Sequence, residues 1–262
     1  MVLSQRYQAQ NQADLLRELV RTRFKLRYNN SILGFIWVLI KPLMNFLILY
    51  FIFTAFRGGS HDKNYAIELL LGIIMFTFLN EGTIFGMNSL LDVSHIILKI
   101  NFPRHLAISS AVLMALINFT INSIILLILS LLLGNLNFSF LNLLYFLYII
   151  GIIYILINSV SLFLSIVLVK VRDLTNIMEL FFQLLFWISA IFYGYNEIVG
   201  DTGNLIRLNP LAILIEAARK ALFYNEIILV NQIVIISSLT IILYFLGRHF
   251  FGKNITKIAE YF

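Results

Sequence analysis

Residues 140–169 read FLNLLYFLYIIGIIYILINSVSLFLSIVLV, an apolar run without a charged side chain. A helix needs about 20 apolar residues to cross roughly 30 Å of hydrocarbon, so this run is long enough to span a bilayer. Five comparable apolar runs occupy most of the remaining chain, at residues 35–56, 65–91, 106–133, 177–195 and 227–246. The sequence therefore predicts an all-α integral membrane protein with six transmembrane helices.

The composition agrees with a bilayer as the main solvent. Hydrophobic residues make up 60% of the chain and charged residues 12%, whereas soluble domains are close to half apolar and a quarter charged. The absence of cysteine excludes disulfides and thiolate chemistry, and the 4 histidines are scattered instead of clustered as metal ligands. We therefore expect no metal and no cofactor in this chain.

Basic residues are divided unevenly between the two sides of the predicted bundle. Lys and Arg near the cytoplasmic ends of spans orient helical membrane proteins. With both termini in the cytoplasm, the outside receives only Arg57, Lys63, Arg207, Arg219 and Lys220 of the 19 Lys and Arg residues. We read the net charge of +6 as a topology signal and not as a nucleic-acid surface. The expected parts are a cytoplasmic region 1–34, a six-span domain 35–247 and a cytoplasmic tail 248–262.

Two stretches outside the spans are expected to be helical. In residues 13–28 the apolar side chains fall on one side of a helix and most charged ones on the other, which predicts an amphipathic helix at the membrane interface. Residues 197–226 are too long for a tight turn, and their apolar run at 211–215 is too short to span the bilayer. We expect this outer segment to form short helices that dip into the membrane.

Residues 247–254 read GRHFFGKN and nearly match the phosphate-binding loop of nucleotide hydrolases. We reject the match because Asn254 stands where Ser or Thr is needed, two phenylalanines occupy the loop, and a membrane helix precedes it instead of a strand. The 13 acidic residues are spread singly, unlike the clustered carboxylates of a membrane enzyme. The chain is therefore expected not to be an enzyme, and any nucleotide hydrolysis belongs to a separate polypeptide.

Glu81 lies well inside the second span, where a carboxylate is costly unless it is paired, protonated or facing water. Two interpretations stay open, namely proton coupling and a structural hydrogen bond between helices. In the same span, Gly82 and Gly86 form a pattern of small residues that can bring two helices close together.

Aromatic residues make up 15% of the chain and form faces on two of the predicted spans. These faces consist of Phe46, Tyr50 and Phe53 on the first span and Phe182, Phe186 and Tyr193 on the fifth. Stacking on such faces could let a sugar chain slide past. Lipid contact, core packing and interfacial belts produce the same pattern.

The segment 23–42, RFKLRYNNSILGFIWVLIKP, resembles the first segment of permeases in type 2 ABC exporters of polysaccharides. In that family an amphipathic interface helix passes through a Leu-Gly turn into the first span, and Leu33 and Gly34 occupy that turn here. Further matches are LKINFPR at residues 98–104, RDL at 172–174, and Asn209-Pro210 with Arg219. The resemblance therefore covers essentially the whole chain.

The resemblance implies a half-transporter that exports O-antigen, teichoic acid or capsule-type glycans, carried on a polyprenyl lipid, across a bacterial cytoplasmic (inner) membrane. In that family two permeases form a homodimer bound to two ATPase subunits, which hold ATP and Mg. It further implies that two cytoplasmic segments contact the ATPase. Their residues are Ile96, Lys99, Phe102, Pro103, Arg104, Arg172 and Asp173. Topological anchoring is the alternative role of the basic members.

Arg23 and Arg27 fall among the leucines of the predicted amphipathic helix, one turn apart. A guanidinium group offers a fork of donors suited to phosphate oxygens, and a lipid-linked glycan presents its phosphates at about this depth. We expect Arg23, Arg27 and Tyr28, next to the Leu33-Gly34 turn, to receive the lipid phosphates. Snorkelling to lipid headgroups, or pairing with acids of the ATPase, is the alternative.

Two other classes of protein remain open. A drug or small-lipid exporter of the same superfamily would share the fold, but without the Arg-Tyr and Leu-Gly segment. A membrane enzyme acting on polyprenyl phosphates would share the substrate, and would turn over in detergent without an ATPase.

Overall fold

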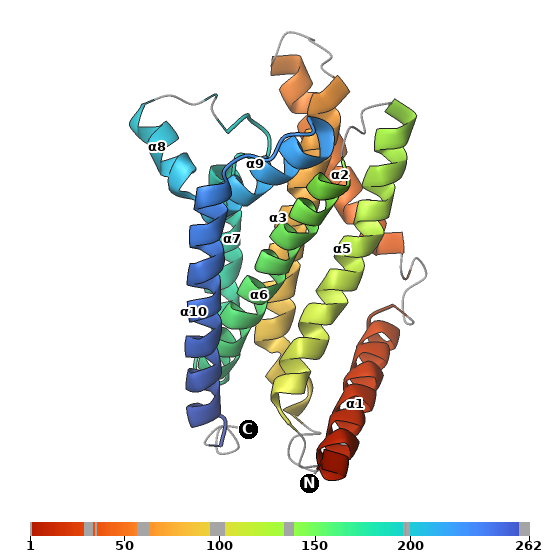
Figure 1. The fold of residues 1–262 in the computed structure, drawn as a ribbon, viewed down its shortest axis with the longest axis vertical. Coiled ribbons are helices and arrows are strands. Elements are labelled where there is room, and N and C mark those ends of the chain that lie inside the picture. Colours follow the sequence, from red (N-terminus) through yellow and green to blue (C-terminus); the bar gives the residue numbers. More distant parts are fainter. Residues whose placement is uncertain are drawn as a thin grey trace.

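The computed structural model describes residues 2–28, 34, 36–56, 63–94, 103–133, 139–195, 197 and 200–256. Within these ranges the chain forms helices and short connections without a strand, so the predicted all-α class is confirmed. The long helices run roughly along one axis and build an elongated bundle (Figure 1).

Five of the described helices are long and apolar enough to cross a bilayer. They are α2 (Ile36–Phe56), α3 (Lys63–Asp92), α5 (His105–Leu133), α6 (Phe140–Lys170) and α10 (Val230–Asn254). The first four match the predicted runs closely. The helix α10 continues eight residues past the predicted end because Arg248 and Lys253 are unfavourable in hydrocarbon but not in a helix.

The predicted run 177–195 overlaps a shorter helix, α7 (Leu174–Ile188), of 15 residues, which begins before the run and ends within it. The helix ends because the chain turns at Ser189 and Ala190, and Ala190 adopts a left-handed φ of 50°. The apolar residues that follow, including Ile191 and Phe192, are buried in this turn instead of extending the helix. At 1.5 Å per residue, α7 is about 22 Å long, which is less than the roughly 30 Å of a hydrocarbon core.

The helix α3 forms the centre of the bundle and contacts α2, α5, α6, α7 and α9 (Pro210–Phe223). Of its most apolar stretch, 72% is buried, compared with 11% for α2 and 22% for α10. The faces of α2 and α10 are therefore left to lipid or to a partner chain.

Small residues allow α6 to pack closely against α3 and α10. A Cβ atom on Gly82 would lie 2.9 Å from the Ile157 side chain, and one on Gly86 would lie 2.1 Å from Ser161 Oγ. On the other side of α6, a Cβ on Gly247 would lie 2.8 Å from the carbonyl oxygen of Ser159. The close approach that the Gly82-Gly86 pattern allows is therefore present, between α3 and α6.

The helix α1 (Val2–Tyr28) packs against α5 at the end of the bundle where α10 ends (Figure 1). Its apolar side chains Leu15, Leu16, Leu19, Val20 and Phe24 are partly buried, whereas Arg17, Glu18, Arg21 and Lys25 are exposed. The opposite end carries α8 (Asp201–Leu208) and α9. The helix α9 begins at Pro210, and the Asn209 side chain caps it by accepting from the Leu211 N–H at 2.9 Å.

Candidate functional site

Arg23 forms hydrogen bonds that connect α1 to the rest of the bundle. Its Nη1 donates to Asp92 Oδ2 at 2.8 Å, its Nη2 to the carbonyl oxygen of Ser89 at 3.1 Å, and its Nε to Ser110 Oγ at 3.2 Å. Asp92 and Ser89 lie at the end of α3, and Ser110 lies in α5, so one guanidinium group joins three helices. This packing role explains why an arginine stands on the leucine side of α1.

Arg27 lies one turn further along α1, and its guanidinium carbon is 3.9 Å from the centroid of the Phe85 ring on α3. A cavity of about 500 Å³ lies between α1, α3 and α5, and we call it the α1 cavity. Both arginines line it. Its other walls include the apolar side chains of Leu26, Phe85 and Met114. Cationic groups beside apolar walls suit an anionic head group that carries an alkyl chain.

A chain of hydrogen bonds leads from the last residue of α1 into the bundle. The Tyr28 hydroxyl donates to Asn118 Oδ1 at 3.2 Å, and Asn118 Nδ2 donates to Glu81 Oε2 at 3.1 Å. Burial raises the pKa of the Tyr28 hydroxyl, which therefore stays protonated and remains a donor. The structural interpretation of Glu81, a hydrogen bond between helices, therefore has a partner in Asn118 on α5.

Gly34 lies just before α2 and has a φ of 42°, in the left-handed region that favours glycine. This backbone conformation explains why a glycine occupies the predicted Leu-Gly turn. Its neighbour Leu33 lies outside the described residues.

A second cavity, of about 760 Å³, lies between α2, α3 and α7, and we call it the α2–α7 groove. Its polar lining comes from all three helices and comprises Lys41, Asn45, Thr77, Asn80, Glu81, Glu179 and Gln183. Its aromatic lining comprises Trp37, Phe76, Phe182, Phe186 and Trp187. Polar groups set among aromatic rings are typical of a ligand-binding surface.

The predicted aromatic residues divide between this groove and a neighbouring cluster. Phe182 and Phe186 line the groove, but Phe182 is only 4% exposed and packs edge-on against Phe76. The others belong to ring pairs at the same side of the bundle, with Phe46 on Tyr50, Phe53 on Phe192, and Tyr193 on Phe192. Several of these contacts are core packing, which was the alternative interpretation of the aromatic faces.

Sequence reasoning singled out Glu81 but missed most of the polar lining of the α2–α7 groove. Lys41, Asn45, Glu179 and Gln183 are exposed polar side chains within apolar helices. Polar groups of that kind usually face a cavity or a partner, so they could have been singled out. The two tryptophans Trp37 and Trp187 were also missed, because neither belongs to a repeating aromatic face.

The predicted ATPase contacts are only partly described. Ile96, Lys99 and Phe102 lie outside the described residues, whereas Pro103 and Arg104 form the turn into α5. The carbonyl oxygen of Pro103 accepts from the Leu106 N–H at 2.9 Å. Arg172 and Asp173 are exposed in the turn between α6 and α7. Both turns lie at the end of the bundle where α1 packs (Figure 1).

The fold defines a multi-pass helical membrane protein, and comparison with known proteins identifies its family. Residues 14–223 match the family model described as "ABC-2 type transporter". Because this match covers most of the chain, the chain belongs to that family, and it is a transport subunit.

Relatives align along nearly the whole chain. The protein named "O-antigen export system permease protein RfbA" from Myxococcus xanthus is 21% identical over 248 residues, with 94% of each chain covered. Two proteins from Klebsiella pneumoniae carry the same name. One is 28% identical over 261 residues, with 99% of each chain covered, and the other is 27% identical over 256 residues, with 94% of each covered.

Proposed function

We propose that this chain is the membrane permease of an ATP-driven exporter that moves an O-antigen-type polysaccharide out of the cytoplasm. The near full-length match to three proteins named O-antigen export permeases carries this proposal. The alignments cover 94% to 99% of this chain and of each relative. A drug or small-lipid exporter of the same family has no comparable support.

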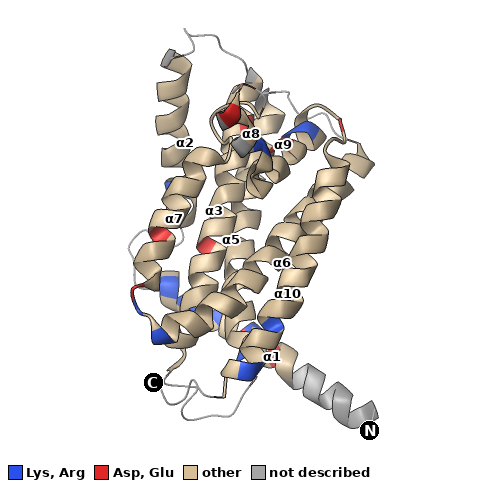
Figure 2. Cartoon of the chain, turned by 90° about the vertical axis from the view of Figure 1, so that its left-hand side faces the viewer, with Lys and Arg blue, Asp and Glu red and all other residues tan. Residues whose placement is uncertain are grey.

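The proposed topology has six spans, with α7 as the fifth in chain order and both termini in the cytoplasm. The helix α7 is short, but its apolar character and its direction between α6 and the outer segment support a crossing in a locally thinned bilayer. Figure 2 shows most Lys and Arg at the end of the bundle where α1 packs, as expected for a cytoplasmic face. On this topology, α1 lies at the cytoplasmic interface and α8 and α9 form the outer segment.

The proposed assembly is a homodimer that binds two copies of an ATPase. Lys41, Asn45, Glu179 and Gln183 are exposed in the α2–α7 groove, so a second copy of the chain could close this groove into a path. The low burial of α2 supports a partner there. The turns at Pro103-Arg104 and Arg172-Asp173 lie at the same end of the bundle, which is the proposed cytoplasmic face, and an ATPase could bind them there.

The proposed substrate is a glycan linked to a polyprenyl phosphate. The cavity at Arg23 and Arg27 would receive the lipid phosphates, and the α2–α7 groove would pass the sugar chain. Because Arg23 already donates to three groups within the chain, Arg27 is the better candidate for direct phosphate contact. Arg23 would then hold α1 in the position that presents Arg27.

Deletion of the gene tests the export function directly. We expect surface polysaccharide to disappear and lipid-linked polysaccharide to accumulate at the cytoplasmic face of the membrane, with recovery when the wild-type chain is restored. Normal surface polysaccharide in the deletion strain, together with a lost efflux of drugs or small lipids, would contradict the proposal.

Substitution of the two arginines tests the role of the α1 cavity. Arg27→Lys keeps the charge but loses the guanidinium fork, so export should fall while the chain still assembles with its ATPase. Arg23→Lys should mainly weaken the docking of α1, which is measured by protease sensitivity of the α1 segment. Normal export by the Arg27→Lys variant would exclude forked phosphate recognition there.

A further inference from the structure

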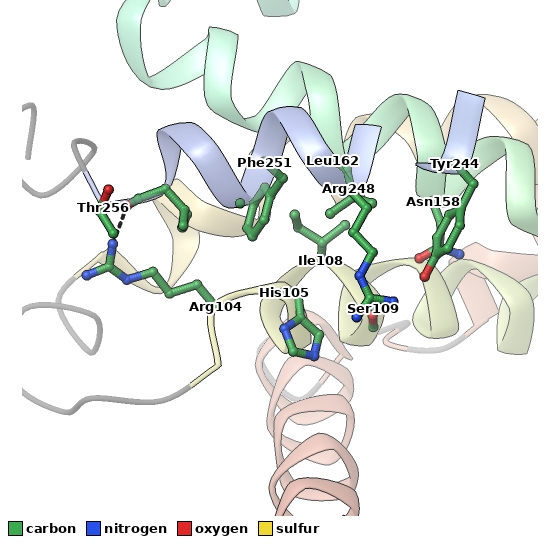
Figure 3. A pocket seen from close by; sticks show the side chains of 12 residues that line it. Arg104, His105, Ile108, Ser109, Asn158, Leu162, Tyr244, Arg248, Phe251 and Thr256 are labelled. Atoms are coloured by element: carbon green, nitrogen blue, oxygen red, sulfur yellow. Dashed lines mark hydrogen bonds between the residues drawn. The ribbon is translucent and has the colours of Figure 1, made fainter. Parts of the chain in front are cut away.

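A third cavity, of about 620 Å³, lies between α5, α6 and the last turns of α10 (Figure 3). Three basic side chains line it, namely Arg104 and His105 at the start of α5 and Arg248 on α10. None of its lining residues belongs to the α1 cavity or to the α2–α7 groove. It is therefore a separate site that the proposed export path does not use.

The positive charge of this cavity is uncompensated within the part of the chain that the structure describes. No Asp or Glu there forms an ion pair with Arg104, His105 or Arg248. Arg104 donates through Nη1 to the carbonyl oxygen of Ile255, which fixes the side chain without neutralising it. Figure 3 shows the His105 ring beside the Arg248 guanidinium group. A phosphate between these two side chains would pair with the Arg248 guanidinium group and accept a hydrogen bond from the His105 imidazole, which has an N–H donor in either protonation state.

The remaining lining has both polar and apolar parts. Ser109, Asn158 and Tyr244 supply hydroxyl and amide groups, whereas Ile108, Leu162 and Phe251 form an apolar wall. On α10 next to Tyr244, Phe245 and Leu246 are 64% and 60% exposed. A soluble anion needs no such apolar surface, but the acyl chains of a phospholipid do.

The position of the cavity along the bundle agrees with a head group. Arg104 precedes α5 and Arg248 lies near the end of α10, and both helices are long enough to cross a bilayer. Their ends fall where the head groups lie, whichever way the chain is inserted. Basic pockets between transmembrane helices at this depth are suited to anionic lipids.

We propose that this cavity binds one anionic phospholipid, with its phosphate group held by Arg248 and His105. The glycerol and the start of the acyl chains lie against Leu162 and Phe251. The bound lipid joins the start of α5 to the end of α10. Arg104 lies at the edge of the same cavity and directly follows the segment proposed to contact the ATPase. A bound lipid would therefore stabilise the contact between that segment and the ATPase.

Native mass spectrometry of the purified full chain tests this site. The chain is titrated in detergent with phosphatidylglycerol, which is anionic, and separately with phosphatidylcholine, which carries no net charge. We expect one phosphatidylglycerol to be retained preferentially. Removal of the Arg248 charge should weaken this retention roughly fivefold, and the Arg248→Ala, His105→Ala double variant, which also lacks the imidazole donor, should lose more of it. Arg248→Lys should retain the lipid better than Arg248→Ala.

Lys253→Ala is the matched control, because Lys253 is an exposed basic residue on α10 that does not line the cavity. It should retain phosphatidylglycerol as the wild type does. Equal loss in this control would show general charge attraction and overturn the site. Retention of phosphatidylcholine to the same extent, or replacement of the lipid by inorganic phosphate, would also overturn it. Unfolding temperatures of all variants show whether a loss reflects misfolding, and Arg248 is exposed enough to be replaced without unfolding.

Discussion

Arg219 on α9 donates a hydrogen bond from Nη2 to the carbonyl oxygen of Ile191 at 2.6 Å. The same guanidinium group donates to the carbonyl oxygens of Ala190 at 2.9 Å and of Glu68 at 3.2 Å, and it lies 3.8 Å from Glu216 Oε2. Arg219 is only 3% exposed, so these groups replace the water that would otherwise solvate its charge. One buried side chain therefore holds α9 to α3 and to the turn that ends α7.

Replacing Arg219 by Met should destabilise the fold strongly. The substitution removes the donor to three carbonyl oxygens and the ion-pair partner of the Glu216 carboxylate, and breaking a buried charged network of this kind costs about 3 to 5 kcal/mol. Unfolding in detergent, by heat or by denaturant, measures the loss. Arg207→Met is the control, because Arg207 is exposed on α8, and its effect should stay within about 0.5 kcal/mol. Similar losses in both variants would contradict the role of Arg219.

The close contact of α3 with α6 predicts opposite effects for two glycine substitutions. Gly86→Ala places a Cβ against Ser161 and should destabilise the chain by about 1 to 3 kcal/mol through overpacking. A Cβ on Gly151, in the interior of α6, meets nothing within 4 Å. Gly151→Ala should therefore be neutral or stabilising by up to about 1 kcal/mol. Equal destabilisation by both would mean that general glycine flexibility, and not this contact, matters.

The sequence predicted the long spans well because their length and hydropathy are local properties. Residues 140–169 require a spanning helix whatever surrounds them, and α6 covers Phe140–Lys170. The early end of α7 could not be predicted, because Ile191 and Phe192 are as apolar as a span but become buried in a turn through tertiary contacts. Hydropathy reports that such residues avoid water, and does not report whether lipid or protein covers them.

The contacts of the functional residues could not be predicted from local sequence patterns either. A helical wheel found that Arg23 lies on the apolar side of α1, which was correct and unusual. The reason is contacts with Asp92, Ser89 and Ser110, far away in the sequence, which no local pattern reveals. The α2–α7 groove was missed because its polar side chains come singly from three helices. Some of them, such as Glu81, can be singled out as polar groups within an apolar span, but only the packing of the helices brings them together in one groove.

Single-cysteine labelling should establish the proposed orientation, since the chain has no cysteine of its own. Glu226 lies between α9 and α10, and Asp173 lies between α6 and α7, and both are exposed. Glu226→Cys should react with an impermeant thiol reagent applied to the outer face of the cytoplasmic membrane, and Asp173→Cys should react only after the membrane is permeabilised. The reverse pattern would invert the topology, and labelling of both from outside would mean that α7 does not cross.

The aromatic lining of the α2–α7 groove predicts a separation of stability from transport. Phe182 is 4% exposed, so Phe182→Ala should cost roughly 3 to 5 kcal/mol of stability. Trp187 also lines the groove but is 51% exposed, so Trp187→Ala should change stability little and slow polysaccharide export. Export and unfolding are measured on the same variants. Normal export by a stable Trp187→Ala chain would remove the groove from the sugar path.

Glu81 offers the sharpest test of what a charge inside the bundle does. It accepts a hydrogen bond from Asn118 Nδ2 at 3.1 Å and also lines the α2–α7 groove. Glu81→Gln keeps an oxygen that can accept this bond and removes only the ability to ionise, so we expect export to continue and stability to change by less than about 1 kcal/mol. Glu81→Leu removes the acceptor and leaves the buried Asn118 amide without it, which should cost about 1 to 3 kcal/mol. Glu179→Gln is the control, because Glu179 lines the same groove from α7 and is exposed. The contrary outcome is a Glu81→Gln variant that loses export at unchanged stability, while Glu179→Gln exports normally. The Glu81 carboxylate would then act through its charge or its proton, and the structural interpretation would be wrong.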